Sequence, residues 1–416
     1  MRILALLNKF PFGVTDGGSA VSRALAVSVR ALDPDATIVT PDTPKHPFQP
    51  ALLPPALAAP PWQAISCATH LHPWDFLKAI VAGRSYHLWR YQRPASEFQL
   101  RRYVEQNGPD VCILEGMAGL AFLPFIRRYF PDLPCLYYAH NVEWKVWESL
   151  YNKIPAWKPQ KWLYKHLYLH LQREELQALR LATGVSGVSA EDVRWFSEVG
   201  GIRALPVWYP GLWETLPEPR APEYRQGSPL RLYHLGSMDW KPTLQGISYF
   251  IRNIWPRLKR AIPEAELHLA GAHMPKSWFT YRIPGLFVQG RVECPDQFLA
   301  DKHACVVPVF AGSGIKIKVV EAMAYGKPVI TTQVGAAGLP ILPGQHYLQA
   351  DSPGEFEAAV RTLRDNPPAR HALALEGRKA IERFFNRVHA TEALKKLLYS
   401  LGTGPPPTFE LHRTKE

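Results

Sequence analysis

Residues 311–326, AGSGIKIKVVEAMAYG, join a glycine-rich loop to a helical pattern that carries lysines and a glutamate. In helical register Ser313, Ile317 and Glu321 fall on one face, so Glu321 is expected beneath the mouth of the loop. Backbone N–H groups of the loop and first turn can hold phosphate oxygens, helped by the helix dipole and by Lys316 and Lys318. A carboxylate one turn deeper can accept bonds from sugar hydroxyls. The pattern suits an anion with a polyol attached, although an ordinary strand-to-helix connection with solvated lysines would read the same.

More polar groups follow predicted strands of the first half. The apolar run Asp110–Leu114 ends at Glu115, and Leu133–Tyr138 delivers His140 and Glu143, with an asparagine between them. Ligands of open parallel sheets bind beyond the carboxyl ends of the strands, which is where these side chains are expected. A lone histidine is more often structural. Three polar residues at one strand end favour a functional site.

A glycine pair follows the first strand. Ile3–Leu7 has the length of a strand covered on both faces, and a helical pattern runs from Ala20 to Leu32. Between them, Gly17 and Gly18 allow a ligand to approach the backbone closely at a helix N-terminus. Their spacing is not that of the dinucleotide-binding fingerprint.

Alternation of short apolar runs with helical patterns occurs twice along the chain. It predicts two doubly wound, Rossmann-like α/β domains with parallel sheets. The segment 211–228 is rich in proline, glycine and charge, and is expected to link domain 1–210 to domain 229–385. We expect a helix at 386–402 to pack back on the first domain, and the tail 403–416 to be mobile. Other strands are expected at 36–40, 183–189, 204–208, 230–235, 265–270, 286–289, 304–309 and 328–332, with irregular structure at 41–61 and solvated helices within 74–106.

Composition narrows the class of protein. The 48 lysines and arginines exceed the 36 acidic residues, which gives a net charge of +12 and favours an anionic partner. Five scattered cysteines suit reduced thiols in a cytoplasmic protein, and no second cluster completes a metal site around Cys67, His70 and His72. No apolar run is long enough to span a membrane, and the start of the chain reads as a buried strand instead of a signal peptide.

The segment 153–180 predicts an amphipathic helix after Pro159. Lysines at 153, 158, 161 and 165 alternate with tryptophans and tyrosines over a leucine stripe. Basic residues with interfacial aromatics are what a helix lying on an anionic bilayer needs. Core packing explains the leucine stripe equally well. Contact with an anionic membrane surface through 153–170 is therefore one of two interpretations.

Taken together, these motifs resemble the two-domain glycosyltransferases of the GT-B fold, in the retaining group called family 4. The resemblance covers roughly residues 1–400. It rests on Gly17-Gly18, His140-Asn141-x-Glu143, Val188-Ser189, Gly236-Ser237-Met238-Asp239-Trp240 and, above all, Gly312-Ser313-Gly314-Ile315-Lys316-Ile317-Lys318 running to Glu321.

The resemblance implies two domains facing across a cleft and a nucleotide-diphosphate sugar as substrate, with no bound cofactor or metal. Glu321 would bind the ribose, residues 312–316 would hold the diphosphate and sugar, and His140 would approach the donor sugar. Glu115 and Glu143 are further candidates in the cleft. The acceptor would be a saccharide or a lipid-linked sugar of cell-surface polysaccharide or glycoconjugate synthesis, at the cytoplasmic face of a membrane.

Two departures from the family pattern stand out. Ser313 occupies the place of the usual first glutamate, which affects sugar recognition. In the 236–242 loop, only Lys241 represents the usual Arg and Lys, about one residue out of register. Lys316 or Lys318 is therefore expected to share the neutralisation of the diphosphate.

Three alternatives remain. A nucleotide-sugar epimerase can share the fold and would isomerise its substrate without an acceptor. A non-catalytic, membrane-associated partner would have a decayed site. A nucleic-acid binder is suggested by charge alone, and the sequence shows no recognition module of the usual kinds, so no nucleic acid is expected as a partner.

Overall fold

The computed structural model describes residues 1–13, 16–58, 61–67, 69–70, 72–152, 154–220, 222, 224–225, 227–312 and 314–402. The chain forms two compact units, one made of Met1–Val14, Val21–Gly211 and Arg387–Glu416, the other of Thr15–Ala20 and Leu212–Asn386. Each unit is built around one six-stranded sheet, and all neighbouring strands are parallel. The prediction of two doubly wound parallel sheets is confirmed.

The sheet of the first unit has the strand order β3-β2-β1-β4-β5-β6. Every residue of β1, β4, β5 and β6 is buried, as expected for parallel strands covered by helices on both faces. This burial explains the continuous apolar runs of the sequence. The strands are β1 (Ile3–Leu6), β2 (Thr37–Asp42), β3 (Trp62–Ser66), β4 (Val111–Glu115), β5 (Cys135–Ala139) and β6 (Gly184–Gly187).

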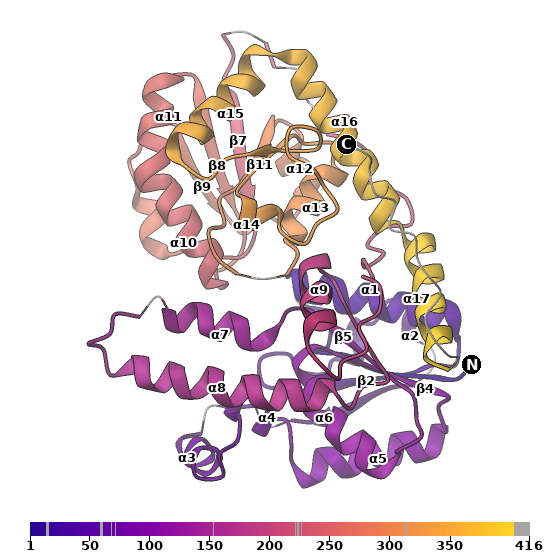
Figure 1. Ribbon diagram of the computed structural model, residues 1–416. Coiled ribbons are helices and arrows are strands. Elements are labelled where there is room, and N and C mark those ends of the chain that lie inside the picture. The colour runs from indigo at the N-terminus through magenta and orange to yellow at the C-terminus, as the bar shows by residue number, and fades with distance from the viewer. Residues whose placement is uncertain are drawn as a thin grey trace. The chain divides into compact units, whose positions relative to one another are not determined.

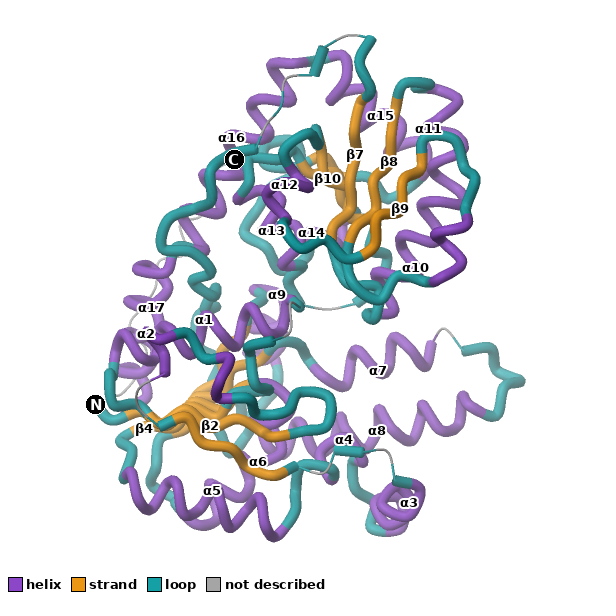
Figure 2. The backbone as a smooth tube through the Cα atoms, turned by 180° about the vertical axis from the view of Figure 1, so that it is seen from behind, coloured by secondary structure: helices purple, strands orange, loops and turns teal. Residues whose placement is uncertain are grey.

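Helix α1 lies on one face of this sheet, and α5 and α6 lie on the other (Figures 1 and 2). Helices α7 and α8 form a hairpin that extends beyond the sheet in both views. The helices are α1 (Gly17–Leu32), α2 (Pro55–Ala58), α3 (Pro73–Val81), α4 (Tyr86–Trp89), α5 (Pro94–Asn107), α6 (Gly116–Tyr129), α7 (Glu143–Asn152), α8 (Gln160–Leu179), α9 (Ala190–Glu198) and α17 (Arg387–Gly402).

The second unit repeats the architecture with the order β12-β11-β10-β7-β8-β9. Helices α10 and α11 cover one face of its sheet, and α12 and α13 lie on the opposite side (Figures 1 and 2). Its strands are β7 (Leu230–Leu235), β8 (Ala265–Ala270), β9 (Leu286–Gly290), β10 (Ala304–Val307), β11 (Val329–Thr331) and β12 (Leu348–Gln349). Its helices are α10 (Lys241–Tyr249), α11 (Trp255–Ala261), α12 (Pro295–Leu299), α13 (Ile317–Ala324), α14 (Gln333–Ala336), α15 (Pro353–Asp365) and α16 (Pro367–Phe385).

In both sheets, the order in which strands are added along the chain reverses at an equivalent point, called the switch point. The chain leaves β1 and later returns beside it as β4, and it leaves β7 and later returns beside it as β10. Loops that follow such a pair of strands diverge to opposite faces and leave a crevice, which is where open α/β sheets bind ligands. The two switch points therefore mark where functional side chains are to be sought.

Two sequence-based assignments of secondary structure were wrong, and two strands were not predicted. Residues 204–208 form no strand: the chain makes a single bridge, between Ala204 and Val185, because Pro206 lacks the N–H that a ladder needs. Segment 41–61 contains the end of β2, helix α2 and a 3-10 turn, Pro50–Leu52. The edge strands β3 and β12 were not predicted, since WQAIS and LQ lack the apolar run of a central strand.

Helix α17 belongs to the first unit and packs on it, although nearly the whole second unit separates the helix from the rest of the first unit in sequence. Trp208 Nε1 donates to Ala390 O at 2.7 Å, and an Arg203 nitrogen donates to Ser400 O at 2.8 Å. The tail 403–416 lies outside the described residues. No helix in the described part of the chain is long and apolar enough to cross a membrane.

A buried carboxylate of α8 caps the start of α7. The side chain of Glu175 accepts the backbone N–H groups of Glu143 at 3.0 Å and Trp144 at 2.9 Å. Burial, and then the neighbouring Glu143, raise the pKa of Glu175 to about 8. Burial likewise raises the pKa of Glu143 to about 7, against the lowering effect of His140 and a hydrogen bond with Asn141. This pair fixes the segment that carries His140.

These raised pKa values make stability depend on pH. The folded protein keeps protons that an unfolded chain releases above the ordinary glutamate pKa of 4.5, so the free energy of unfolding falls as the pH rises from about 5 to about 8. Glu175→Gln removes the ionisable group. As the pH rises over this interval, we expect the urea midpoint of the variant to fall less than that of the parent. Parallel pH profiles would contradict the assignment, and the exposed Glu198→Gln should leave the profile unchanged.

Candidate functional site

Glu115 connects three strand ends at the switch point of the first unit. It is fully buried at the end of β4. Its carboxylate accepts Asn8 N at 2.8 Å and Ser22 Oγ at 2.9 Å, and lies 2.7 Å from His140 Nε2. A buried carboxylate is costly unless hydrogen-bonded, and here both oxygens have partners. The predicted residues Glu115 and His140 are thus brought together.

The first turn of α6 depends on a glycine beside this node. Gly116 has a φ of 56°, and a Cβ on it would lie 2.7 Å from Asn8 Cγ. Asn8 Oδ1 accepts the N–H of Ala118 at 3.2 Å. Only glycine fits this backbone and this space, so the start of α6 and the loop after β1 are held together.

His140 and Glu143 lie between β5 and the start of α7. The side chain of His140 is only 12% exposed, and its ring meets that of Tyr138 edge-on, with centroids 6.0 Å apart. Glu143 interacts electrostatically with His140, and its raised pKa means that it is partly protonated near neutral pH. The group can therefore exchange a proton in the physiological range.

Gly17 and Gly18 are the first residues of α1, so the helix begins before Ala20, where the sequence pattern had placed its start. The carboxylate of Asp16 accepts the N–H of Ser19 at 2.7 Å, and Asp16 O accepts that of Ala20 at 3.0 Å. The helix thus starts with a side-chain cap. What the glycines bind remains a prediction.

The glycine loop of the second unit follows β10. Gly312 has a φ of 113°, and a Cβ there would lie 2.9 Å from Trp240 Cζ2, so the loop packs directly on that ring. Gly314 is buried, with a φ of 70°. Helix α13 begins only at Ile317, so the helical register links Ile317 and Glu321. Ser313 lies outside the described residues.

The two lysines of the motif have different surroundings. Lys316, 3% exposed, donates to Gly314 O and so supports the loop from inside. Lys318 Nζ donates to Thr243 Oγ1 at 2.6 Å and lies 5.8 Å from the centre of the Trp240 ring. It is also the atom nearest to a Cβ built on Gly236, at 3.2 Å. Lys318 therefore reaches the loop after β7, and Ile315 between the two is half-buried.

Burial lowers the pKa of Lys318 to about 8, although Cys305, Glu321 and Asp239 oppose this effect. A lysine with this pKa is charged at neutral pH and loses its charge slightly above it. An ammonium that is incompletely solvated gains more from an anionic ligand than one in water does.

His234 was not predicted. It is fully buried near the end of β7, and Nδ1 lies 2.8 Å from Val306 O across the switch point. A carbonyl only accepts, so Nδ1 carries the proton and Nε2 is an acceptor. Burial, then Lys318, lower the pKa of the ring to about 3, which keeps it neutral. Nε2 lies 3.4 Å from a Cβ built on Gly236 and has no partner among the described residues. Its place two residues before Gly236 was the available signal.

The remaining predicted residues of this unit are exposed. Glu321 is exposed on α13, one turn after the start of the helix. Lys241 is exposed at the first position of α10. Within the described ranges, no three His, Cys, Asp or Glu side chains are grouped to hold a metal ion.

The arrangement of the second unit can hold a charged phosphate group. Lys318 supplies a positive charge, the loops at Gly236 and Gly312 supply backbone, and Glu321 supplies acceptors for hydroxyls. The first unit offers an imidazole held by a buried carboxylate. These are the groups for stabilising a leaving anion and orienting a polar substrate.

Comparison with known proteins agrees with this geometry. The family described as glycosyl transferases group 1 matches residues 229–366. No curated protein matches the chain in sequence.

Solved structures resemble the chain over almost its full length. A sucrose-phosphate synthase from Thermosynechococcus elongatus has a TM-score of 0.67 at 16% identity, covering 97% of this chain and 99% of that one. HepE from Anabaena, in complex with UDP-glucose, has a TM-score of 0.62 at 15% identity, covering 96% and 100%. A TarM variant from S. aureus, with UDP, fondaparinux and a GlcNAc-glycerol, has 0.62 at 11% identity, covering 97% and 100%.

The low identities show the fold, and the family match covers the unit that contains Lys318 and Glu321. The chain therefore has the two-unit GT-B fold, and its residues 229–366 are a glycosyl transferases group 1 domain.

Proposed function

We propose that this protein transfers a sugar from a nucleotide-diphosphate sugar to a saccharide or lipid-linked acceptor, with retention of configuration. The observation that carries the proposal is Lys318, a partly buried ammonium at the switch point of the matched domain. It lies next to the Gly236 loop, and Glu321 follows on the same helix.

Lys318 is the residue we assign to the diphosphate. The loop after β7 carries no arginine, and Lys241 is exposed at its edge. Lys316 bonds its own loop. Lys318 thus takes over the charge neutralisation that the family pattern places in the 236–242 loop, while Lys316 shapes the glycine loop.

Glu321 is the residue we assign to the ribose. An ionised carboxylate accepts two hydroxyl donors, which suits a vicinal diol. UDP and UDP-glucose are bound in the similar HepE structures. Uridine nucleotides are therefore the donors to test first.

Breaking the bond between the sugar C1 and the diphosphate leaves negative charge on the phosphate and positive charge on the ring. Lys318 and the loop N–H groups stabilise the former. The acceptor oxygen then bonds to C1, and its proton passes to the departing phosphate oxygen. Glu115 is a poor nucleophile for a covalent intermediate, because it is fully buried and three donors occupy its oxygens.

His140 is the candidate catalytic residue of the first unit, and Glu115 is its positioning residue. The 2.7 Å bond fixes the imidazole plane and its tautomer. Glu143, with its pKa near 7, tunes the charge around the ring.

We place the reaction in the cytoplasm, in the synthesis of a cell-surface polysaccharide or glycoconjugate. Five free cysteines, four of them buried, support a reducing compartment. The similar structures include a lipopolysaccharide galactosyltransferase and a complex with a saccharide. A saccharide acceptor is the simplest extension of these neighbours.

Glu321→Ala tests the ribose assignment. Losing bonds to a charged group costs about 1.5–3 kcal/mol, so UDP and UDP-sugars should bind about tenfold to a hundredfold more weakly. Calorimetric titration measures this, and a thermal-shift panel of nucleotide sugars identifies the donor. The exposed Glu382→Ala is the matched control. Equal affinity in Glu321→Ala and the parent would overturn the assignment and favour a decayed site.

Lys318→Met tests the diphosphate assignment. In the parent, the affinity for UDP should fall as the pH rises through about 8, because the ammonium loses its proton. In Lys318→Met the affinity should be low and independent of pH in that range. Titrations at several pH values measure this. If the pH dependence persists in Lys318→Met but is lost in Lys241→Met, the charge belongs to Lys241 instead.

Glu115→Gln tests the positioning of His140. Replacing an ionic hydrogen bond by a neutral one should cost about 1.5 kcal/mol of transition-state stabilisation. We therefore expect kcat to fall about tenfold while the donor KM changes little. A kcat equal to that of the parent and of Glu198→Gln, or a loss that falls on the donor KM instead, would exclude the role. Isomerised nucleotide sugar formed without an acceptor would indicate an epimerase instead.

A further inference from the structure

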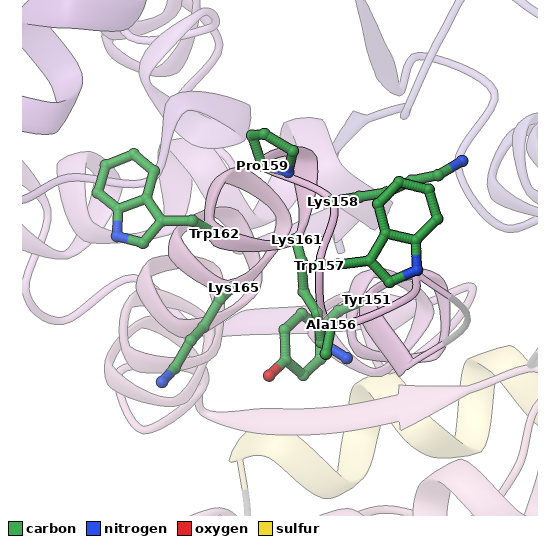
Figure 3. Close-up of a pocket in the computed structure, with 8 residues that line it drawn as sticks. All are labelled: Tyr151, Ala156, Trp157, Lys158, Pro159, Lys161, Trp162 and Lys165. Atoms are coloured by element: carbon green, nitrogen blue, oxygen red, sulfur yellow. The ribbon is translucent and has the colours of Figure 1, made fainter.

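The tip of the α7–α8 hairpin exposes two tryptophans to solvent. Trp157 is 79% exposed and Trp162 is 66% exposed. Figure 3 shows their rings pointing to opposite sides of a shallow hollow of about 280 Å³. Exposing a tryptophan ring to water is energetically unfavourable. A pair of exposed tryptophans at the end of a projecting hairpin therefore indicates a contact site. Residues lining the hollow include Tyr151, Trp157, Lys158, Lys161, Trp162 and Lys165.

The α8 side of the same tip carries only positive charge. Residues 154–173 contain Lys158, Lys161, Lys165 and Arg173 and no aspartate or glutamate. Lys158 lies 5.4 Å from the centre of the Trp157 ring, and Lys161 lies 4.8 Å from that of Tyr151. Lys153, part of the sequence-based prediction, lies outside the described residues. The partner of this tip must therefore be anionic and able to accept aromatic rings.

A second element extends the surface. Helix α3 buries Ala79 and packs Phe76 against Tyr86, together with Leu163 and Leu167 of α8. Its opposite face exposes apolar residues three and four positions apart, which places them on one side of the helix. They are Trp74 at 67%, Leu77 at 48% and Val81 at 82% exposed.

A row of contacts connects α3 to the hairpin tip. Gly83, just after α3, accepts a hydrogen bond from His170 Nδ1 at 2.9 Å. The His170 and His166 rings lie 4.1 Å apart, and His166 stacks on Trp162 at 5.9 Å. These contacts run from the end of α3 to the exposed ring of Trp162. We term the exposed face of α3 and the hairpin tip together the docking surface.

We propose that this docking surface, the hairpin tip with the exposed face of α3, binds the anionic surface of a lipid bilayer. The exposed aliphatic residues decide between occupants. Leu77 and Val81 gain nothing from the phosphates of a nucleic acid or the hydroxyls of a polysaccharide, but they are removed from water at a bilayer interface. Tryptophan rings lie at the headgroup level, where lysines meet lipid phosphates.

The sequence had predicted solvated helices within 74–106, and for α3 that interpretation misses the apolar face. Three of its exposed residues are apolar, and its single acid, Asp75, is paired with Arg93 at 2.6 Å. The docking surface is independent of the donor site, because its residues lie in the first unit, outside the strand ends that hold Glu115 and His140.

Co-sedimentation of the full chain with vesicles tests the proposal. We expect binding to an equimolar mixture of phosphatidylglycerol and phosphatidylcholine, little binding to phosphatidylcholine alone, and weaker binding at high salt. Each lysine near an anionic surface contributes about fivefold in affinity, so Lys158→Gln with Lys165→Gln should lower the partition coefficient by an order of magnitude or more. Lys161 is left intact because it donates to Ile154 O.

Two further variants test the apolar part. Trp157→Ala with Trp162→Ala, and separately Leu77→Ser with Val81→Ser, should each weaken vesicle binding at constant charge. The matched control, Phe98→Ala with Arg102→Gln, removes an exposed aromatic and a cation from α5 of the same unit, and should bind as the parent does. UDP titration should give the parent's affinity in every variant, which separates this inference from the donor-site proposal.

The contrary results are equally defined. No binding to the anionic vesicles at low salt overturns the proposal, as does equal binding by the parent and the lysine and tryptophan variants. A loss as large in the control variant would mean that net charge alone acts. Capture by a soluble acidic polysaccharide or nucleic acid, without vesicle binding, would assign the surface to a different partner.

Discussion

A buried carboxylate must be hydrogen-bonded. In the first unit, the hydrogen bonds that Glu115 accepts hold together the elements that meet at the switch point. Its partners come from the loop after β1, from α1 and from the residue after β5. Desolvation makes each of these bonds stronger than it would be in water and makes an unmet oxygen costly. His140 is therefore held by the same interaction that joins three elements of the fold.

The second unit has a partly buried cation in the corresponding place. Lys318 is partly desolvated, its ammonium bonds one hydroxyl, and a neutral imidazole lies close to the same loop. Burial lowers the pKa of both groups, but the consequences differ. His234 is neutral in the physiological range. Lys318 remains charged at neutral pH but is incompletely solvated, so an anionic ligand would stabilise it. In the proposed function, that anion is the diphosphate of the nucleotide-sugar donor.

The docking surface adds a separate interaction to this picture. Its aromatic and aliphatic side chains are exposed because α3 and the α7–α8 hairpin cover one another only on their inner faces, around Ala79, Tyr86 and Leu167. Glu175 contributes indirectly, since it caps the start of α7 and so fixes where the hairpin leaves the sheet. The segment that presents His140 and the hairpin that bears the docking surface thus share one anchor.

The sequence alone determined the alternation of strands and helices, and with it the two parallel sheets. Central strands are covered on both faces, so their apolar runs are visible without knowledge of any partner. The sequence named Glu115, His140, Lys318 and Glu321 as candidates for the same reason, because strand ends and glycine loops are local patterns. The tertiary structure decided what depends on residues far apart. The edge strands β3 and β12 exist through pairing with a neighbour, the different surroundings of Lys316 and Lys318 follow from which atoms each ammonium reaches, and the bond between Glu115 and Asn8 joins residues 107 positions apart. His234 and the apolar face of α3 became visible only once burial and exposure were known.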